Sequence, residues 1–174
     1  MYLKLNQLKD FLIKNKVKKR LSNVTPDFNS NPIKTVGIIF DETHFEKKVA
    51  ILNELLKKGI PLEKISVLIF NTITKKNQAF EHPTFSPNDF TLAANFKNPD
   101  VNEFISKKFD LLINYYDIEK AALLQVSNLS KASFKVGFSA VDKRINHFMI
   151  NTTTDNYKVF IDELFKYLKI LNKI

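Results

Sequence analysis

Short, continuous runs of apolar residues recur along the chain from residue 35 onward. The runs cover residues 35–40, 65–70, 110–114, 134–138 and 147–150. Runs of this length without polar alternation are typical of strands that are buried on both faces of a sheet. The segments between them place apolar residues at helical spacing, and a last such segment covers residues 156–172. Strands that alternate with helices predict an α/β fold with a mostly parallel sheet.

The predicted architecture is a single open, mostly parallel, Rossmann-like sheet of about five strands, with helices on both faces. Residues 71–98 show no clear periodicity and contain the turn signal Ser86-Pro87-Asn88-Asp89. They predict one or two short edge strands within an irregular loop. We see no internal repeat.

Polar residues beside the periodic segments predict where the helices begin. Thr43-x-x-Glu46 is a capping-box pattern, and Gly59 closes the helix that it opens. Further predicted caps are Asn98, for a helix that ends near Lys108, Asp117, for a helix over residues 118–129, and Thr154 or Asp155, for the last helix. The predicted inward-facing positions are Val49, Leu52, Leu55 and Leu56 in the first helix and Ala121, Leu124 and Leu129 in the last of these.

Residues 1–22 predict a basic amphipathic helix in front of this domain. Leu5, Leu8 and Leu12 form a stripe at helical spacing, but Lys16 and Lys19 project on the same side. We therefore expect the first three turns to dock and the basic end to reach solvent. Residues 23–33 hold two prolines among Ser and Asn residues and predict a linker. The α/β domain then covers residues 34–174.

The formal net charge of +9 is concentrated in the same segment. Residues 1–20 hold seven basic groups and one acidic group, whereas the remaining 154 residues hold 20 and 17. The favoured function is a non-catalytic binding module whose basic helix contacts the phosphates of RNA or a ribonucleoprotein. The expected polyanion-binding residues are Lys14, Lys16, Lys18, Lys19 and Arg20.

Other interpretations of this helix stay open. Lysine, asparagine, isoleucine and phenylalanine are favoured by AT-rich codons, so the lysine excess can reflect genome composition. The helix could pack on the domain or on a second copy in a homodimer, with its lysines solvated. A membrane-surface role is less favoured, because the apolar stripe is short and the chain has no tryptophan.

Several classes of protein are excluded by what the sequence lacks. With no cysteine, the chain cannot form disulfides or Cys-ligated metal sites. Its three glycines cannot compose a dinucleotide fingerprint or a P-loop, and no zinc-protease or nucleophile-elbow motif occurs. We expect no cofactor and no metal. No signal peptide or membrane-spanning run is present, which predicts a cytoplasmic protein.

An open α/β sheet binds its ligands beyond the carboxyl ends of its strands. The residues that follow the predicted strands form a possible ligand rim: Asp41, His44, Asn114, Tyr115, Asp117 and Arg144. Asp41 and His44 could act as a general base pair or hold a metal, or Asp41 could serve the start of the next helix. Arg144 could clamp a phosphate or pair with Asp142. A small enzyme with its site here is the alternative to the binding module.

The segment FDLLINYYDIEKAALLQVSNLSKASFKVGF, residues 109–138, resembles the first domain of heptosyltransferase-type glycosyltransferases. The shared order is strand, helix, small residue and a strand that ends in Val-Gly-Phe. The loop at residues 41–44 lacks the glycine that this family has there. The resemblance implies the fold, and it makes a degenerate glycosyltransferase-like domain one form of the enzyme alternative.

A second resemblance covers nearly the whole chain. The basic N-terminal helix, VGIIF, Ser86-Pro87-Asn88-Asp89-Phe90, FDLLINYY, KASFKVGF and ELFKYLKILNKI resemble a family of uncharacterised flavobacterial proteins, a domain of unknown function. This resemblance implies a compartment and a fold but no activity, so it transfers no catalytic residue.

Overall fold

A computed structural model describes residues 2–25, 31–43, 45–72, 81–91 and 93–174, with the side chains of residues 2–10 excepted. Its elements, in chain order, are α1 (Tyr2–Arg20), β1 (Val36–Asp41), α2 (Lys48–Lys57), the 3-10 turn η1 (Leu62–Lys64), β2 (Ile65–Phe70), β3 (Thr84–Phe85), η2 (Pro87–Asp89), α3 (Pro99–Ser106), β4 (Leu111–Tyr115), α4 (Ala121–Leu129), β5 (Phe134–Phe138), η3 (Lys143–Ile145), β6 (Phe148–Ile150) and α5 (Tyr157–Ile170).

The strands form one open sheet in the order β3-β2-β1-β4-β5-β6, and every neighbouring pair is parallel. Val36 of β1 stands opposite Ile65 of β2 on one side and Leu111 of β4 on the other. This order is that of the Rossmann fold, and its direction of winding reverses between β1 and β4. The predicted fold class is therefore confirmed, with six strands because β3 pairs at the edge.

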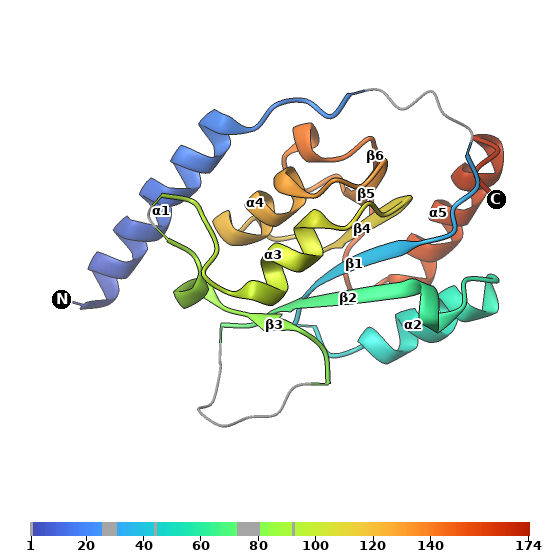
Figure 1. The fold of residues 1–174 in the computed structure, drawn as a ribbon, viewed down its shortest axis with the longest axis horizontal. Coiled ribbons are helices and arrows are strands. Elements are labelled where there is room, and N and C mark those ends of the chain that lie inside the picture. Colours follow the sequence, from blue (N-terminus) through green and yellow to red (C-terminus); the bar gives the residue numbers. More distant parts are fainter. Residues whose placement is uncertain (1, 26–30, 44, 73–80, 92) are drawn as a thin grey trace.

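Helices cover both faces of the sheet, as predicted (Figure 1). α2 and α5 lie on one face, and α3 and α4 lie on the other with α1 alongside α4. Side chains alternate between the two layers along each strand. In β1, Ile38 and Phe40 enter the core beneath α2 and α5, whereas Ile39 enters the core beneath α3 and α4.

Gly37 of β1 is required by close packing. A Cβ atom at this position would lie 2.7 Å from Cδ2 of Phe109, a buried ring just before β4. Such a contact forces the ring or the strand to move. Glycine at this position therefore leaves room for the Phe109 ring to pack against β1.

Two predicted helix caps are wrong, because Thr43 and Asp117 bind Lys120 and Thr154 instead. α2 begins at Lys48, after Thr43 and Glu46, and its cap residue Lys47 makes no side-chain cap bond. α4 begins at Ala121 rather than after Asp117. The cap at Asn98 is confirmed, since its side chain accepts a hydrogen bond from the Asp100 backbone N–H.

Some predicted inward-facing positions are also wrong. Ile51 and Leu55 are the buried residues of α2, whereas Val49 and Leu56 are exposed. Leu129 of α4 is exposed as well. In α1 the outcome is similar, because Leu12 is 58 % exposed. When a helix has two apolar stripes on adjacent sides, the spacing of its apolar residues does not show which stripe is buried.

α1 packs on the domain through the end that was expected to reach solvent. Ile13, Val17 and Leu21 recur every four residues, are buried, and join the core beneath α3 and α4. The helix therefore docks by its last turns. Within the ranges that the structure describes, no helix is both long enough and apolar enough to cross a membrane.

Candidate ligand pocket at the carboxyl edge of the sheet

The residues of the predicted ligand rim lie in separate places. Asn114 and Tyr115 are both fully buried and, as neighbours in β4, point to opposite faces of the sheet. Asp117 accepts hydrogen bonds from the backbone and the hydroxyl of Thr154. His44 lies outside the described residues. Their role in ligand binding stays a prediction.

Asn114 belongs to a buried polar chain beneath α4. Its side-chain amide donates to Asn146 Oδ1 over 2.7 Å, and its Oδ1 accepts from the Ser127 hydroxyl over 2.7 Å. Tyr116 OH lies 2.7 Å from the same serine oxygen. Burial raises the pKa of Tyr116 above its ordinary range, and the hydrogen bond with Ser127 opposes this rise only in part. These groups bind one another and so hold β4 to α4.

Arg144 pairs with Asp142, as one of the two interpretations predicted. Its Nη2 lies 2.6 Å from Asp142 Oδ2, and its Nε donates to Oδ1 over 2.9 Å. Nη1 donates to the carbonyls of Lys18 and Leu21. A cation at these carbonyls satisfies acceptors that the end of α1 leaves open. Arg144 therefore fastens the C-terminal end of α1 to the domain.

The ion pair between Arg144 and Asp142 makes the stability of the protein fall at acid pH. Its hydrogen bonds lower the pKa of Asp142 to about 2, against burial, which raises it. Because this pKa is lower in the folded protein than in the unfolded chain, Asp142 stabilises the fold at pH values above the unfolded pKa of 3.8. This contribution is lost as the pH falls through about 2. We expect wild type to lose about 1–2 kcal/mol more stability than Asp142→Asn between pH 5 and pH 2. Urea unfolding at several pH values measures this, and parallel curves would contradict it.

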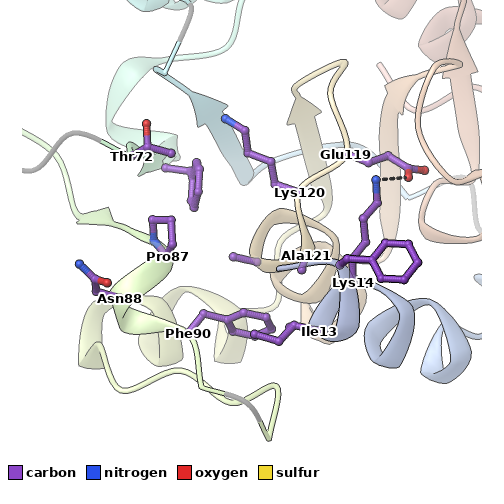
Figure 2. Close-up of a pocket in the computed structure, with 12 residues that line it drawn as sticks. Ile13, Lys14, Thr72, Pro87, Asn88, Phe90, Glu119, Lys120 and Ala121 are labelled. Atoms are coloured by element: carbon purple, nitrogen blue, oxygen red, sulfur yellow. Dashed lines mark ion pairs between the residues drawn. The ribbon is translucent and has the colours of Figure 1, made fainter. Parts of the chain in front are cut away.

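A pocket of about 520 Å³ opens beyond the carboxyl end of β2, beside the start of α4 (Figure 2). Its wall combines α1, the end of β2, η2 and the first residues of α4. The lining residues are Phe11, Ile13, Lys14, Phe70, Thr72, Pro87, Asn88, Phe90, Glu119, Lys120, Ala121 and Ala122. It therefore lies at the edge of the sheet where Rossmann-type domains bind ligands.

One ion-pair cluster joins α1 to the segment before α4. Nζ of Lys14 and Nζ of Lys18 lie 3.1 and 2.6 Å from Glu119 Oε2. Burial raises the pKa of Glu119, but the hydrogen bonds from Lys18 and Lys14 outweigh it and hold that pKa below its ordinary value. Glu119 is therefore ionised at neutral pH and shared by two cations.

A second ion pair joins β1 to the start of α4. Lys120 Nζ lies 2.5 Å from Asp41 Oδ2 and donates to Thr43 Oγ1 over 2.9 Å. The same ammonium lies 4.9 Å from the centre of the Phe70 ring, within the range of a cation–π contact. The carboxylate of Asp41 is thus held by a lysine and by the Thr43 backbone N–H. Thr43 serves this pair instead of capping α2.

The start of α4 faces the pocket without a side-chain cap. Lys120 occupies the cap position, its side chain makes no cap bond, and Glu119 to Ala122 line the pocket. The first N–H groups of a helix and its dipole favour a negative charge nearby. The pocket therefore combines apolar walls with a helix terminus suited to an anionic group.

Several of the expected polyanion-binding residues contact other parts of the domain. Lys14 and Lys18 pair with Glu119, and Arg20 Nη1 donates to the Ala93 carbonyl over 3.3 Å. Lys19 is exposed, and Lys16 is partly exposed. Contact of this helix with RNA stays a prediction. The pairing with Glu119 was missed because it joins residues about one hundred positions apart.

Sequence reasoning missed most of the pocket lining. Phe70 was assigned to a buried strand, and Asn88 and Phe90 fall in the segment without clear periodicity. Lys120 had no signal beyond its position shortly after the strand over 110–114. Among the described residues, no three His, Asp or Glu side chains come together as a metal site.

A model described as "Family of unknown function (DUF6913)" matches residues 9–171 of the chain. The match confirms the predicted relation to a family of unknown function. No curated protein matches the chain. The resemblance to glycosyltransferases stays a prediction.

Proposed function

The chain belongs to the family of unknown function DUF6913, and from its pocket we propose that the domain binds a small molecule that combines a flat apolar part with an anionic group. The observation that carries this proposal is the pocket of about 520 Å³ at the carboxyl edge of the sheet. Ligand cavities of a few hundred Å³ suit small molecules.

The apolar part of the ligand is indicated by the walls of the pocket. Phe70 and Phe90 contribute rings from β2 and from the residue after η2, and Phe11 contributes an exposed ring from α1. Ile13 also lines the pocket, and it belongs to the same buried core as Phe90. Aromatic rings that face a cavity favour a planar group, which they can stack or meet edge to face.

The anionic part is indicated by the charge at the pocket. Lys14, Lys18 and Lys120 meet two carboxylates, Glu119 and Asp41, so positive charge exceeds negative charge by one. The uncapped start of α4 adds the positive end of a helix dipole. An acidic group of a ligand can interact with the excess positive charge and with the start of α4 without displacing the existing ion pairs.

The aromatic anion 1-anilinonaphthalene-8-sulfonate is a suitable probe, because it has both features and fluoresces when it leaves water. We expect saturable binding to the folded protein. Ala121→Trp should weaken the affinity about tenfold, since the indole fills the pocket at the start of α4. Fluorescence titration measures the change, and circular dichroism checks that the variant is folded.

Val159→Trp is the matched control, since it adds the same ring to an exposed position of α5 on the other face of the sheet. We expect wild-type affinity from this control. Equal affinities for Ala121→Trp and wild type would place the probe elsewhere and overturn the proposal.

A further inference from the structure

A second, smaller cavity lies between the segment after α1, the last turn of α4 and the start of β5. Its volume is about 270 Å³. Three of its lining residues are basic, namely Lys135, Arg144 and His147, and none of its lining residues is acidic. Ser22, Asn128 and Ser133 add polar groups. The lining brings the Lys135 ammonium into a small polar cavity without a carboxylate, and such a cavity suits an anion.

Lys135 is the unusual residue of this cavity. It lies within β5, points toward α4 and is 6 % exposed. Its Nζ donates to the Ser127 carbonyl over 2.8 Å, which satisfies one of its three N–H groups. Burial lowers the pKa of Lys135 to about 8. A buried ammonium is costly unless it is paired with an anion.

The neighbouring basic groups fix the shape of the cavity. His147 Nδ1 accepts from the Lys135 backbone N–H over 2.9 Å, which assigns the ring proton to Nε2. Nε2 then donates to the Thr25 carbonyl over 2.8 Å. The Val24 backbone N–H donates to the Arg144 carbonyl over 2.9 Å. The segment over the cavity is therefore fastened to the domain at two points.

We infer that this cavity binds a small oxyanion, with the ammonium of Lys135 as its counter-charge. The volume admits a group of a few heavy atoms, such as free phosphate or the phosphate or carboxylate end of a metabolite. The site is independent of the pocket at the carboxyl edge, because the two linings share no residue.

A purely structural role for Lys135 makes a different prediction. The lysine could serve only to satisfy a carbonyl in the last turns of α4. The stability of a Lys135→Met protein without an added anion does not separate the two roles, because in both roles the change removes the buried ammonium and leaves the Ser127 carbonyl without its donor. Only the site predicts that an added oxyanion stabilises the wild type, so the test measures stabilisation by the anion.

Thermal unfolding with inorganic phosphate, compared with chloride at matched ionic strength, tests the site. We expect Tm to rise by about 3 °C near saturation. Ser133→Asp should remove this rise, because residues 133 and 135 both line the cavity and the new carboxylate can then pair with Lys135. Acetate in place of phosphate distinguishes a carboxylate site from a phosphate site.

Ser139→Asp is the matched control, since Ser139 is an exposed serine at the other end of β5 and outside the lining of this cavity. It carries the same net charge and should keep the full response. Ala121→Trp should keep it as well, which separates this site from the proposed ligand pocket. No stabilisation of wild type, or an equal response in the Ser133→Asp and Ser139→Asp proteins, would overturn the inference.

Discussion

Tyr115→Ala is expected to lower the free energy of unfolding by about 3–5 kcal/mol. The side chain is 0 % exposed, so its removal leaves a cavity in the core beneath α2 and α5. Its ring centre lies 5.1–5.6 Å from those of Phe40, Phe45, Phe138 and Phe160. Urea unfolding followed by circular dichroism measures the loss.

Tyr115→Phe is the control for the ring. It keeps the aromatic packing and removes only the hydrogen bond from the hydroxyl to the Thr154 carbonyl, which is 2.7 Å long. We expect a cost of about 1 kcal/mol. A Tyr115→Ala protein of nearly wild-type stability would contradict the burial of this side chain in the core.

Val17→Asp is the second large change, and we expect it to detach α1 from the domain. Val17 is 0 % exposed, and a buried carboxylate without a partner is too costly for the docked state. Each buried apolar side chain in this contact contributes about 1.5–3 kcal/mol, so docking is lost rather than weakened. Detachment is measured as faster amide hydrogen exchange in α1 and as faster cleavage by a protease between α1 and β1.

Leu12→Asp is the matched control on the same helix. Leu12 is exposed, so the same change of charge should leave α1 docked and its amides protected. Detachment in the Leu12→Asp protein, with none in the Val17→Asp protein, would reverse the assignment of the docking stripe.

The fold could be predicted because its strands are buried on both faces. A strand covered by helices on each side needs apolar residues at successive positions, and the run VGIIF at residues 36–40 reports this directly. β3 gave no such signal, because its two residues pair only at the sheet edge. The sequence predicted one or two short edge strands within residues 71–98, and β3 is such a strand.

Helix beginnings were less predictable, because capping residues also have distant partners. Thr43 accepts from Lys120, and Asp117 accepts from Thr154, although both sequences resemble caps. Local patterns cannot weigh a cap against a partner supplied by another part of the fold.

The place of the candidate pocket could be predicted, but its residues could not. The rule for open α/β sheets indicates the carboxyl edge, and Asp41 does lie at the end of β1. Asn114 and Tyr115, which the sequence places on one rim, project to opposite faces of the sheet as neighbours in β4. The contribution of α1 to the pocket required the tertiary structure, because its ion pairs with Glu119 join residues about one hundred positions apart.

The most direct test of the proposed ligand pocket is a two-dimensional ¹H–¹⁵N spectrum of the protein during titration with 1-anilinonaphthalene-8-sulfonate. We predict that the largest amide shifts fall on Thr72, Phe90, Ala121 and Ala122, which line the pocket at the carboxyl edge of the sheet. Shifts confined to α2 and α5 would place the ligand on the opposite face and contradict the account.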